Sequence, residues 1–172
     1  MRKNIYIIIS IAVLVLLTVI GCSKEISPEE RKAQFSKAIT ELSKIDKQIL
    51  QQQQKYTETV QLIVSGSVST VDGYQIIQRV NQDLLTIFSK AELIEIPDNA
   101  ATLKEIKESY QVSSGYLRDT TKKTMNYLDS NKTSDLAEAK DALGKGVSMR
   151  QSAAISLAKE AAQQNINLSE NK

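Results

Sequence analysis

The stretch FSKAITELSKIDKQILQQQQKYTETVQLIV, residues 35–64, decides the fold of this chain. Its apolar residues return every seven positions, at Phe35, Leu42, Ile49, Tyr56 and Ile63, flanked by Ile39, Ile45 and Val60. This spacing places the side chains on one stripe of an α-helix, which other helices must cover. The stretch holds neither proline nor glycine, so a long, unbroken helix is expected.

Start and stop signals extend this helix and predict three more. Ser27 as N-cap, Pro28 at the first helical position and Glu30 three residues after the cap form a capping-box start. The expected helices cover about residues 28–64, 70–94, 99–128 and 134–164, with Ser134 or Asp135 capping the fourth. Short connections between long helices favour an all-α, antiparallel up-down four-helix bundle, and a long helical hairpin that dimerises is the alternative.

The fourth predicted helix is rich in small residues. Its expected core face comprises Leu136, Leu143, Val147, Ala154, Leu157 and Ala161. Gly144 and Gly146 lie inside it, and Gly115 lies inside the third helix, where each glycine costs about 1 kcal/mol relative to alanine. Two interpretations remain open, namely close approach of the third and fourth helices, or a hinge around residues 144–146.

Composition excludes several classes of function. The chain has no histidine and a single cysteine, Cys22, so the commonest metal ligands and the usual general base are missing. Removing residues 1–21 takes Arg2 and Lys3 from the 22 basic residues and no acid, which leaves 20 basic residues against 20 acidic ones. Such a balance does not attract nucleic acid. We therefore expect no enzyme activity, no metal, no cofactor and no nucleic-acid partner.

The first 21 residues have the layout of a secretory signal. Arg2 and Lys3 form a positive start, residues 5–20 are an apolar run, and Gly21 is a small residue at the expected cleavage site. As a helix, this run would be only about 24 Å long, short of the roughly 30 Å hydrocarbon core of a bilayer. A cleaved targeting segment is therefore expected rather than a membrane span.

The residues Val19-Ile20-Gly21-Cys22 resemble the lipobox of bacterial lipoproteins. The resemblance implies cleavage after Gly21, a diacylglycerol on the Cys22 thiol and acylation, for example by palmitate, of the freed amine. Two or more acyl chains hold a protein on a membrane where one holds it only marginally. An uncleaved signal anchor with an ordinary Cys22 thiol is the alternative, and both place the domain outside the cytoplasm.

These signals divide the chain into four segments. They are a signal peptide over residues 1–21, a lipidated N-terminus and spacer over 22–27, a helical bundle over 28–165 and a polar tail over 166–172. The expected location is the outer face of the cell membrane, or the outer membrane if the cell has two.

Four polar residues interrupt the apolar spacing near the middle of the predicted bundle. They are Gln52, Asn81, Ser113 and Arg150. One interpretation is a layer of polar groups that satisfy one another and set the helix register. A second is a small ligand pocket with Arg150 as anion partner, because a buried arginine needs a counter-charge. A third is that Arg150 simply faces water.

Two tyrosines fall outside the main apolar faces. Tyr116 and Tyr127 are candidate partner contacts, since exposed tyrosines act as rigid anchors at interfaces. The leading hypothesis is a non-catalytic, lipid-anchored protein that acts through contacts with another protein of the bacterial envelope. The alternative is a small-ligand binder that uses the polar layer around Arg150.

Overall fold

The structure is a computed structural model that describes residues 27–168. The chain divides into two units, Met1–Arg31 and Lys32–Lys172. Gly21 and Cys22, with the whole predicted signal segment, lie outside the described residues. The bundle described below belongs to the second unit, except for residues 28–31 at the start of its first helix.

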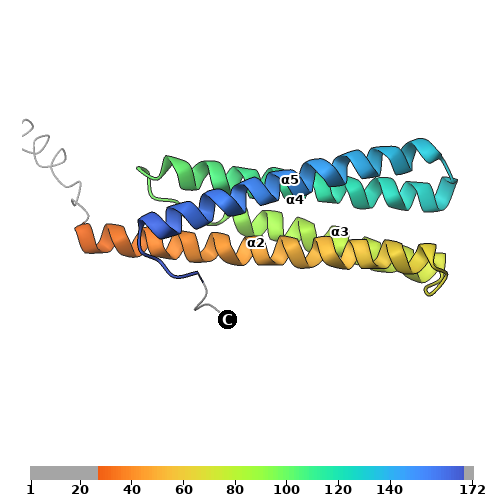
Figure 1. Cartoon of the computed structure of the whole chain (residues 1–172), viewed down its shortest axis with the longest axis horizontal. Coiled ribbons are helices and arrows are strands. Elements are labelled where there is room, and N and C mark those ends of the chain that lie inside the picture. Colours follow the sequence, from red (N-terminus) through yellow and green to blue (C-terminus); the bar gives the residue numbers. More distant parts are fainter. Residues whose placement is uncertain (1–26, 169–172) are drawn as a thin grey trace, which may run out of the picture. The chain divides into compact units, whose positions relative to one another are not determined.

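Four α-helices make up this part of the chain (Figure 1). They are α2 (Pro28–Val64), α3 (Thr70–Glu92), α4 (Ala101–Ser130) and α5 (Thr133–Gln163). Residues 27–168 contain no strand. The prediction of an all-α fold with four helices is therefore confirmed, and each helix lies within a few residues of its expected bounds.

The capping box at the start of α2 is also confirmed. The backbone N–H of Glu30 donates to Ser27 Oγ at 3.1 Å, and the N–H of Ser27 donates to Glu30 Oε2 at 3.2 Å. Each side chain satisfies a backbone donor that the first turn of a helix leaves free.

The predicted cap of the fourth helix was wrong. The cap residue of α5 is Lys132, which makes no side-chain cap hydrogen bond, and the helix begins at Thr133. Asn131 takes a left-handed conformation with φ 56° at the end of α4. Because asparagine tolerates this conformation, the chain reverses direction at Asn131, and α5 begins before Ser134.

The end of α5 turns back onto the bundle. Asn165 has φ 54°, and the N–H of Ile166 donates to the carbonyl of Ala161 at 2.8 Å, as in a Schellman motif. This turn brings Ile166 and Leu168 against the hydrophobic core. Residues 166–168, which the sequence places in a polar tail, thus contribute two apolar side chains to packing.

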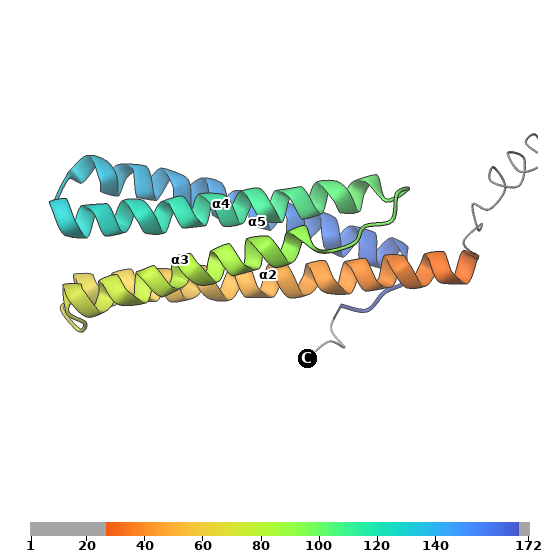
Figure 2. The same cartoon turned by 180° about the vertical axis from the view of Figure 1, so that it is seen from behind.

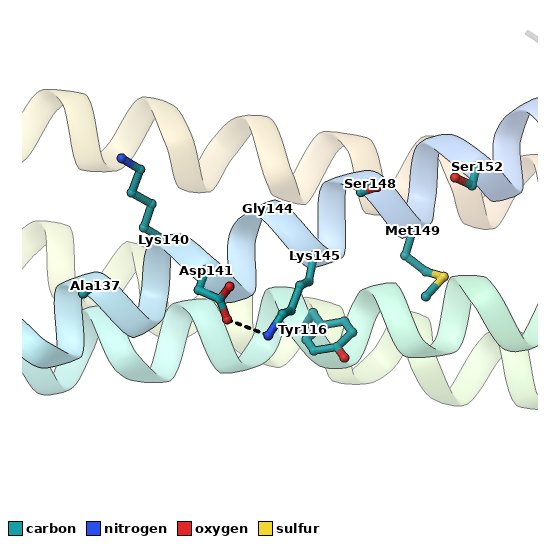
Figure 3. A pocket seen from close by; sticks show the side chains of 9 residues that line it. All are labelled: Tyr116, Ala137, Lys140, Asp141, Gly144, Lys145, Ser148, Met149 and Ser152. Atoms are coloured by element: carbon teal, nitrogen blue, oxygen red, sulfur yellow. Dashed lines mark ion pairs between the residues drawn. The ribbon is translucent and has the colours of Figure 1, made fainter.

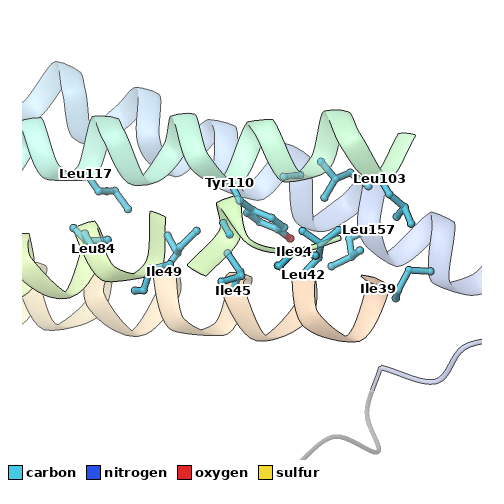
Figure 4. Close-up of a cluster of buried hydrophobic side chains, with 14 of the residues drawn as sticks. Ile39, Leu42, Ile45, Ile49, Leu84, Ile94, Leu103, Tyr110, Leu117 and Leu157 are labelled. Atoms are coloured by element: carbon cyan, nitrogen blue, oxygen red, sulfur yellow. The ribbon is translucent and has the colours of Figure 1, made fainter. Parts of the chain in front are cut away.

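The core is a cluster of mostly aliphatic side chains from all four helices, and it includes Tyr56 and Tyr110. Figure 4 shows Tyr110 among the aliphatic side chains. The largest members that are fully buried are Ile39, Leu42 and Ile49 of α2, Ile77, Val80 and Leu84 of α3, and Leu103 and Tyr110 of α4. The sequence-predicted stripe of α2 is confirmed, since its members are buried or pack against this cluster.

Helices α4 and α5 lie side by side in both views (Figures 1 and 2). A Cβ atom built on Gly146 would lie 3.0 Å from Leu117 Cγ and 3.3 Å from the Ser113 carbonyl oxygen. Ser113 Oγ donates to the Gly146 carbonyl at 2.8 Å. Close helix approach therefore explains Gly146. It does not explain Gly115 or Gly144, which have open space around them.

The core face of α5 differs from the predicted one. Its buried residues are Ala139, Gly146, Arg150, Ala153, Leu157 and Ala161, whereas Leu136 is 43% exposed. The predicted face was therefore rotated by part of a turn at the start of the helix. The physical reason is that small residues let α5 approach α4 closely. The free energy gained from this close packing outweighs the free energy that burial of Leu136 would provide.

Candidate functional site

A buried ion pair joins α5 to α2. Arg150 Nη1 donates to Asp46 Oδ1 at 2.9 Å. Arg150 as a residue is 9% exposed, and the Asp46 side chain is 21% exposed. Arg150 therefore faces the bundle. Asp46 supplies its counter-charge, a residue that the sequence analysis did not identify.

Tyr110 of α4 lies next to this pair. Figure 4 shows its ring pointing from α4 into the core, and the residue is fully buried. Burial raises the pKa of its hydroxyl strongly, and the negative charge of Asp46 adds to this, while Arg150 acts in the opposite direction. The hydroxyl makes no hydrogen bond of ordinary distance and angle, and neither does Arg150 Nε. The cluster thus holds one charge pair and two unpaired donors.

Three of the four predicted polar residues make separate links between helices. Asn81 of α3 donates to the Arg118 carbonyl and to Thr121 Oγ1 of α4. Ser113 joins α4 to α5, and Arg150 joins α5 to α2. The side-chain oxygen of Gln52 is buried without a partner. No hydrogen bond between two of these four is found in residues 27–168, so the structure distributes them along the bundle.

The largest groove on the described surface runs along α5 and has a volume of about 840 Å³. We call it the Tyr116 groove. It is lined by Tyr116 of α4 and by Ala137, Lys140, Asp141, Gly144, Lys145, Ser148, Met149 and Ser152 of α5 (Figure 3). Inside it, Lys145 Nζ contacts Asp141 Oδ2 at 2.7 Å, and this hydrogen-bonded pair raises the pKa of Lys145.

A second groove, of about 520 Å³, lies on the other side of α5. We call it the α2–α5 groove. Its walls are Tyr56, Thr57, Val60 and Gln61 of α2 and Thr133, Leu136, Ala137, Ala139, Lys140 and Leu143 of α5. Ala137 and Lys140 line both grooves. The first half of α5 is therefore a ridge with a groove on each side.

The two candidate tyrosines differ in their surroundings. Tyr116 is half-buried and lines the Tyr116 groove together with a smaller groove between α3 and α4. Tyr127 is also half-buried but lines none of the five main grooves of residues 27–168. Of the two, Tyr116 is placed where a partner could pack on its ring.

Sequence reasoning missed Asp46 and the exposed Leu136. A signal for Asp46 exists, since it lies four residues after Leu42 and three before Ile49, on the inner side of α2. Leu136 had no such signal, because its exposure depends on how α5 rotates against α4.

Other kinds of site are not found in the described part of the chain. Residues 27–168 contain no group of three or more acidic, histidine or cysteine side chains that could hold a metal ion. Within the same residues, every helix is too polar or too short to cross a bilayer. No protein-family model matches the chain, and no curated protein or solved structure is significantly similar to it.

Proposed function

We propose that this chain is a non-catalytic, lipid-anchored helical protein that acts through contacts with another protein of the bacterial envelope. The proposed anchor is lipid on Cys22 after cleavage at Gly21, and the proposed location is extracytoplasmic. Support for the anchor is the lipobox resemblance of residues 19–22 together with the positive and apolar segments before it.

The observation that carries the protein-contact role is the grooved ridge of α5. Its two grooves lie on either side of Lys140, and one of them displays Tyr116. Surfaces that bind proteins are enriched in tyrosine, which offers a large contact area with little loss of rotamer entropy.

We also propose that the bundle has an antiparallel up-down order. Support comes from contacts in which residues late in one helix meet residues early in the next helix. Asn81 in the middle of α3 bonds to Thr121, whereas Glu92 at the end of α3 accepts from Lys107 near the start of α4. Helices α4 and α5 show the same trend in the pairs Ser113 with Gly146 and Lys123 with Glu138.

Crosslinking on intact cells tests the proposed function. Full-length protein is crosslinked and purified, and the attached proteins are identified by mass spectrometry, with Tyr116→Ala and Tyr127→Ala as a matched pair. We expect one envelope protein that is lost from Tyr116→Ala and retained by Tyr127→Ala. Cys22→Ser should move the protein from the membrane fraction to the soluble one. A chain without any specific partner at saturating crosslinker contradicts the role.

Small-ligand binding at the polar layer is the second candidate, favoured by one observation. Tyr110 and Arg150 keep buried donors without partners, which a polar ligand could satisfy. A screen of small anions by thermal shift tests it. A rise in melting temperature that Arg150→Met abolishes would support this role, whereas no shift for any anion would remove it.

A further inference from the structure

The α2–α5 groove has an apolar lining with a single charge. Its largest aliphatic wall residues are Val60, Leu136 and Leu143, and Leu136 is 43% exposed. Lys140 is the one charged residue among those that line it, and it forms no ion pair within residues 27–168. An occupant that matches this surface is therefore apolar and carries a negative charge at one edge.

The tyrosine hydroxyl in the groove wall already has a hydrogen-bond partner inside the bundle. Tyr56 lines the groove, and its hydroxyl lies 2.7 Å from Thr124 Oγ1 of α4. Burial raises the pKa of that hydroxyl, which keeps it neutral at ordinary pH. The ring thus offers an apolar surface while its polar end is turned into the bundle, which leaves Thr57, Gln61, Thr133 and Lys140 as the polar side chains of the lining.

The dimensions of the groove suit a helix. On α5 the lining runs from Thr133 to Leu143, a rise of about 15 Å, which corresponds to about ten residues or nearly three turns of a docked helix. Both walls are helices, whose side-chain ridges form grooves that accept another helix. An acyl chain suits the groove less well, because the groove is open to solvent and small apolar ligands bind where most of their surface is buried.

A second copy of this chain cannot supply such a helix from its described residues. The large apolar side chains exposed there are Leu62, Val64, Val71, Leu93, Val112, Leu136 and Ile155. Only Val64 and Val71 lie seven residues apart, and they belong to different helices, α2 and α3, so none of the four helices displays an apolar stripe on its outer face. Among helices outside these described residues, a helix of a different protein is the occupant that we consider.

We propose that the α2–α5 groove binds one amphipathic helix of a partner protein, whose apolar stripe packs on Leu136 and Val60 and whose carboxylate pairs with Lys140. This inference rests on the proposed function and specifies the chemistry of the partner. It uses the opposite side of the α5 ridge from the Tyr116 groove, so the two surfaces can be tested separately.

The experiment places a photo-reactive phenylalanine analogue at position 136 of the full-length protein in intact cells, and, in a separate variant, at position 116. Ile155 of the same helix is the matched control, since it is an exposed aliphatic residue, 58% accessible, that lines neither groove. The peptide attached to position 136 is sequenced by mass spectrometry. We expect a segment of another protein with apolar residues three and four apart and an acidic residue beside them, and no adduct at position 155.

A synthetic peptide with the sequence of that segment then measures the contacts. Binding to the full-length protein in nanodiscs is followed by fluorescence anisotropy. Leu136→Asp should weaken it about tenfold or more, and Ile155→Asp should leave it unchanged. Lys140→Glu should weaken it several-fold, Lys159→Glu should not, and a peptide with lysine in place of its acid should recover binding to Lys140→Glu.

The outcomes separate the inference from the proposed function. An adduct with a second copy of this chain, with lipid, or with a segment that lacks an apolar stripe overturns the inference. An adduct at position 116 with none at position 136 also overturns it and leaves the proposed function standing. No protein adduct at either position contradicts both. Thermal unfolding midpoints equal to that of the parent protein establish that the variants are folded.

Discussion

Replacing Arg150 with methionine removes the guanidinium that pairs with Asp46 between α5 and α2. The methionine keeps an unbranched apolar side chain, so the packing of the arginine stem is largely retained. What changes is that the Asp46 carboxylate, 21% exposed in the pair, loses the guanidinium that lies 2.9 Å from it, its one ion-pair partner within residues 27–168. The substitution therefore tests how much a mostly buried charge depends on its counter-charge.

The expected loss of unfolding free energy follows from burial. Removing one partner of a buried ion pair costs about 3–5 kcal/mol, and the exposed part of Asp46 reduces this to about 2–4 kcal/mol. Asp46→Leu combined with Arg150→Met removes both charges. This double variant should unfold within about 1 kcal/mol of the parent protein, because a well-packed apolar pair often replaces a buried ion pair at little cost.

Urea unfolding followed by far-ultraviolet circular dichroism measures these free energies for the parent, both single variants and the double variant. The double-mutant cycle isolates the interaction between the two side chains. Lys145→Met serves as the control, since Lys145 forms an exposed ion pair with Asp141 on the same helix, and no resolvable change is expected from it. A loss below about 1 kcal/mol for Arg150→Met, or single effects that simply add, would refute the reasoning.

Three further predictions concern tyrosine ionisation, a helix contact and a cap. Burial raises the pKa of Tyr110 and Tyr56 above the ordinary value of 10.0, so as pH rises the unfolded chain loses these protons first, and the unfolding free energy should fall above about pH 10. Ultraviolet titration should show two tyrosines that ionise late, and Tyr110→Phe should remove one of them; all tyrosines ionising together would contradict this. Gly146→Ala should lower the melting temperature because its Cβ meets α4, whereas Gly144→Ala, with open space around it, should stabilise α5 by about 1 kcal/mol. Ser27→Ala should cost about 1 kcal/mol of unfolding free energy, and Ser27→Thr, which keeps the hydroxyl, should cost less.

Much of the fold was readable from local signals. The seven-residue repeat in α2 and the Ser27–Glu30 capping box depend on residues within one or two helical turns of each other, so neighbouring residues alone predict them. The same holds for the end of α2, where Gly66, with φ 72°, supplies the left-handed residue that closes the helix. Such signals do not depend on which helices become neighbours.

The candidate site was readable only in part. Tyr116 and Arg150 were singled out from their positions against the apolar stripe, but their surroundings were not. The partner of Arg150 is Asp46, which lies 104 residues away in the chain, and the wall opposite Leu136 is formed by α2. No local pattern relates residues so far apart.

The sequence by itself determined that the described chain is helical, where its helices begin and end to within a few residues, and that it contains no histidine. The tertiary structure alone decided the rotation of α5, because contact with α4 through Gly146 outweighs the burial of Leu136. That rotation turns Arg150 toward Asp46 and leaves Leu136 at the rim of a groove. The physical reason is that helix formation is governed by neighbouring residues, whereas helix orientation is governed by packing between distant ones.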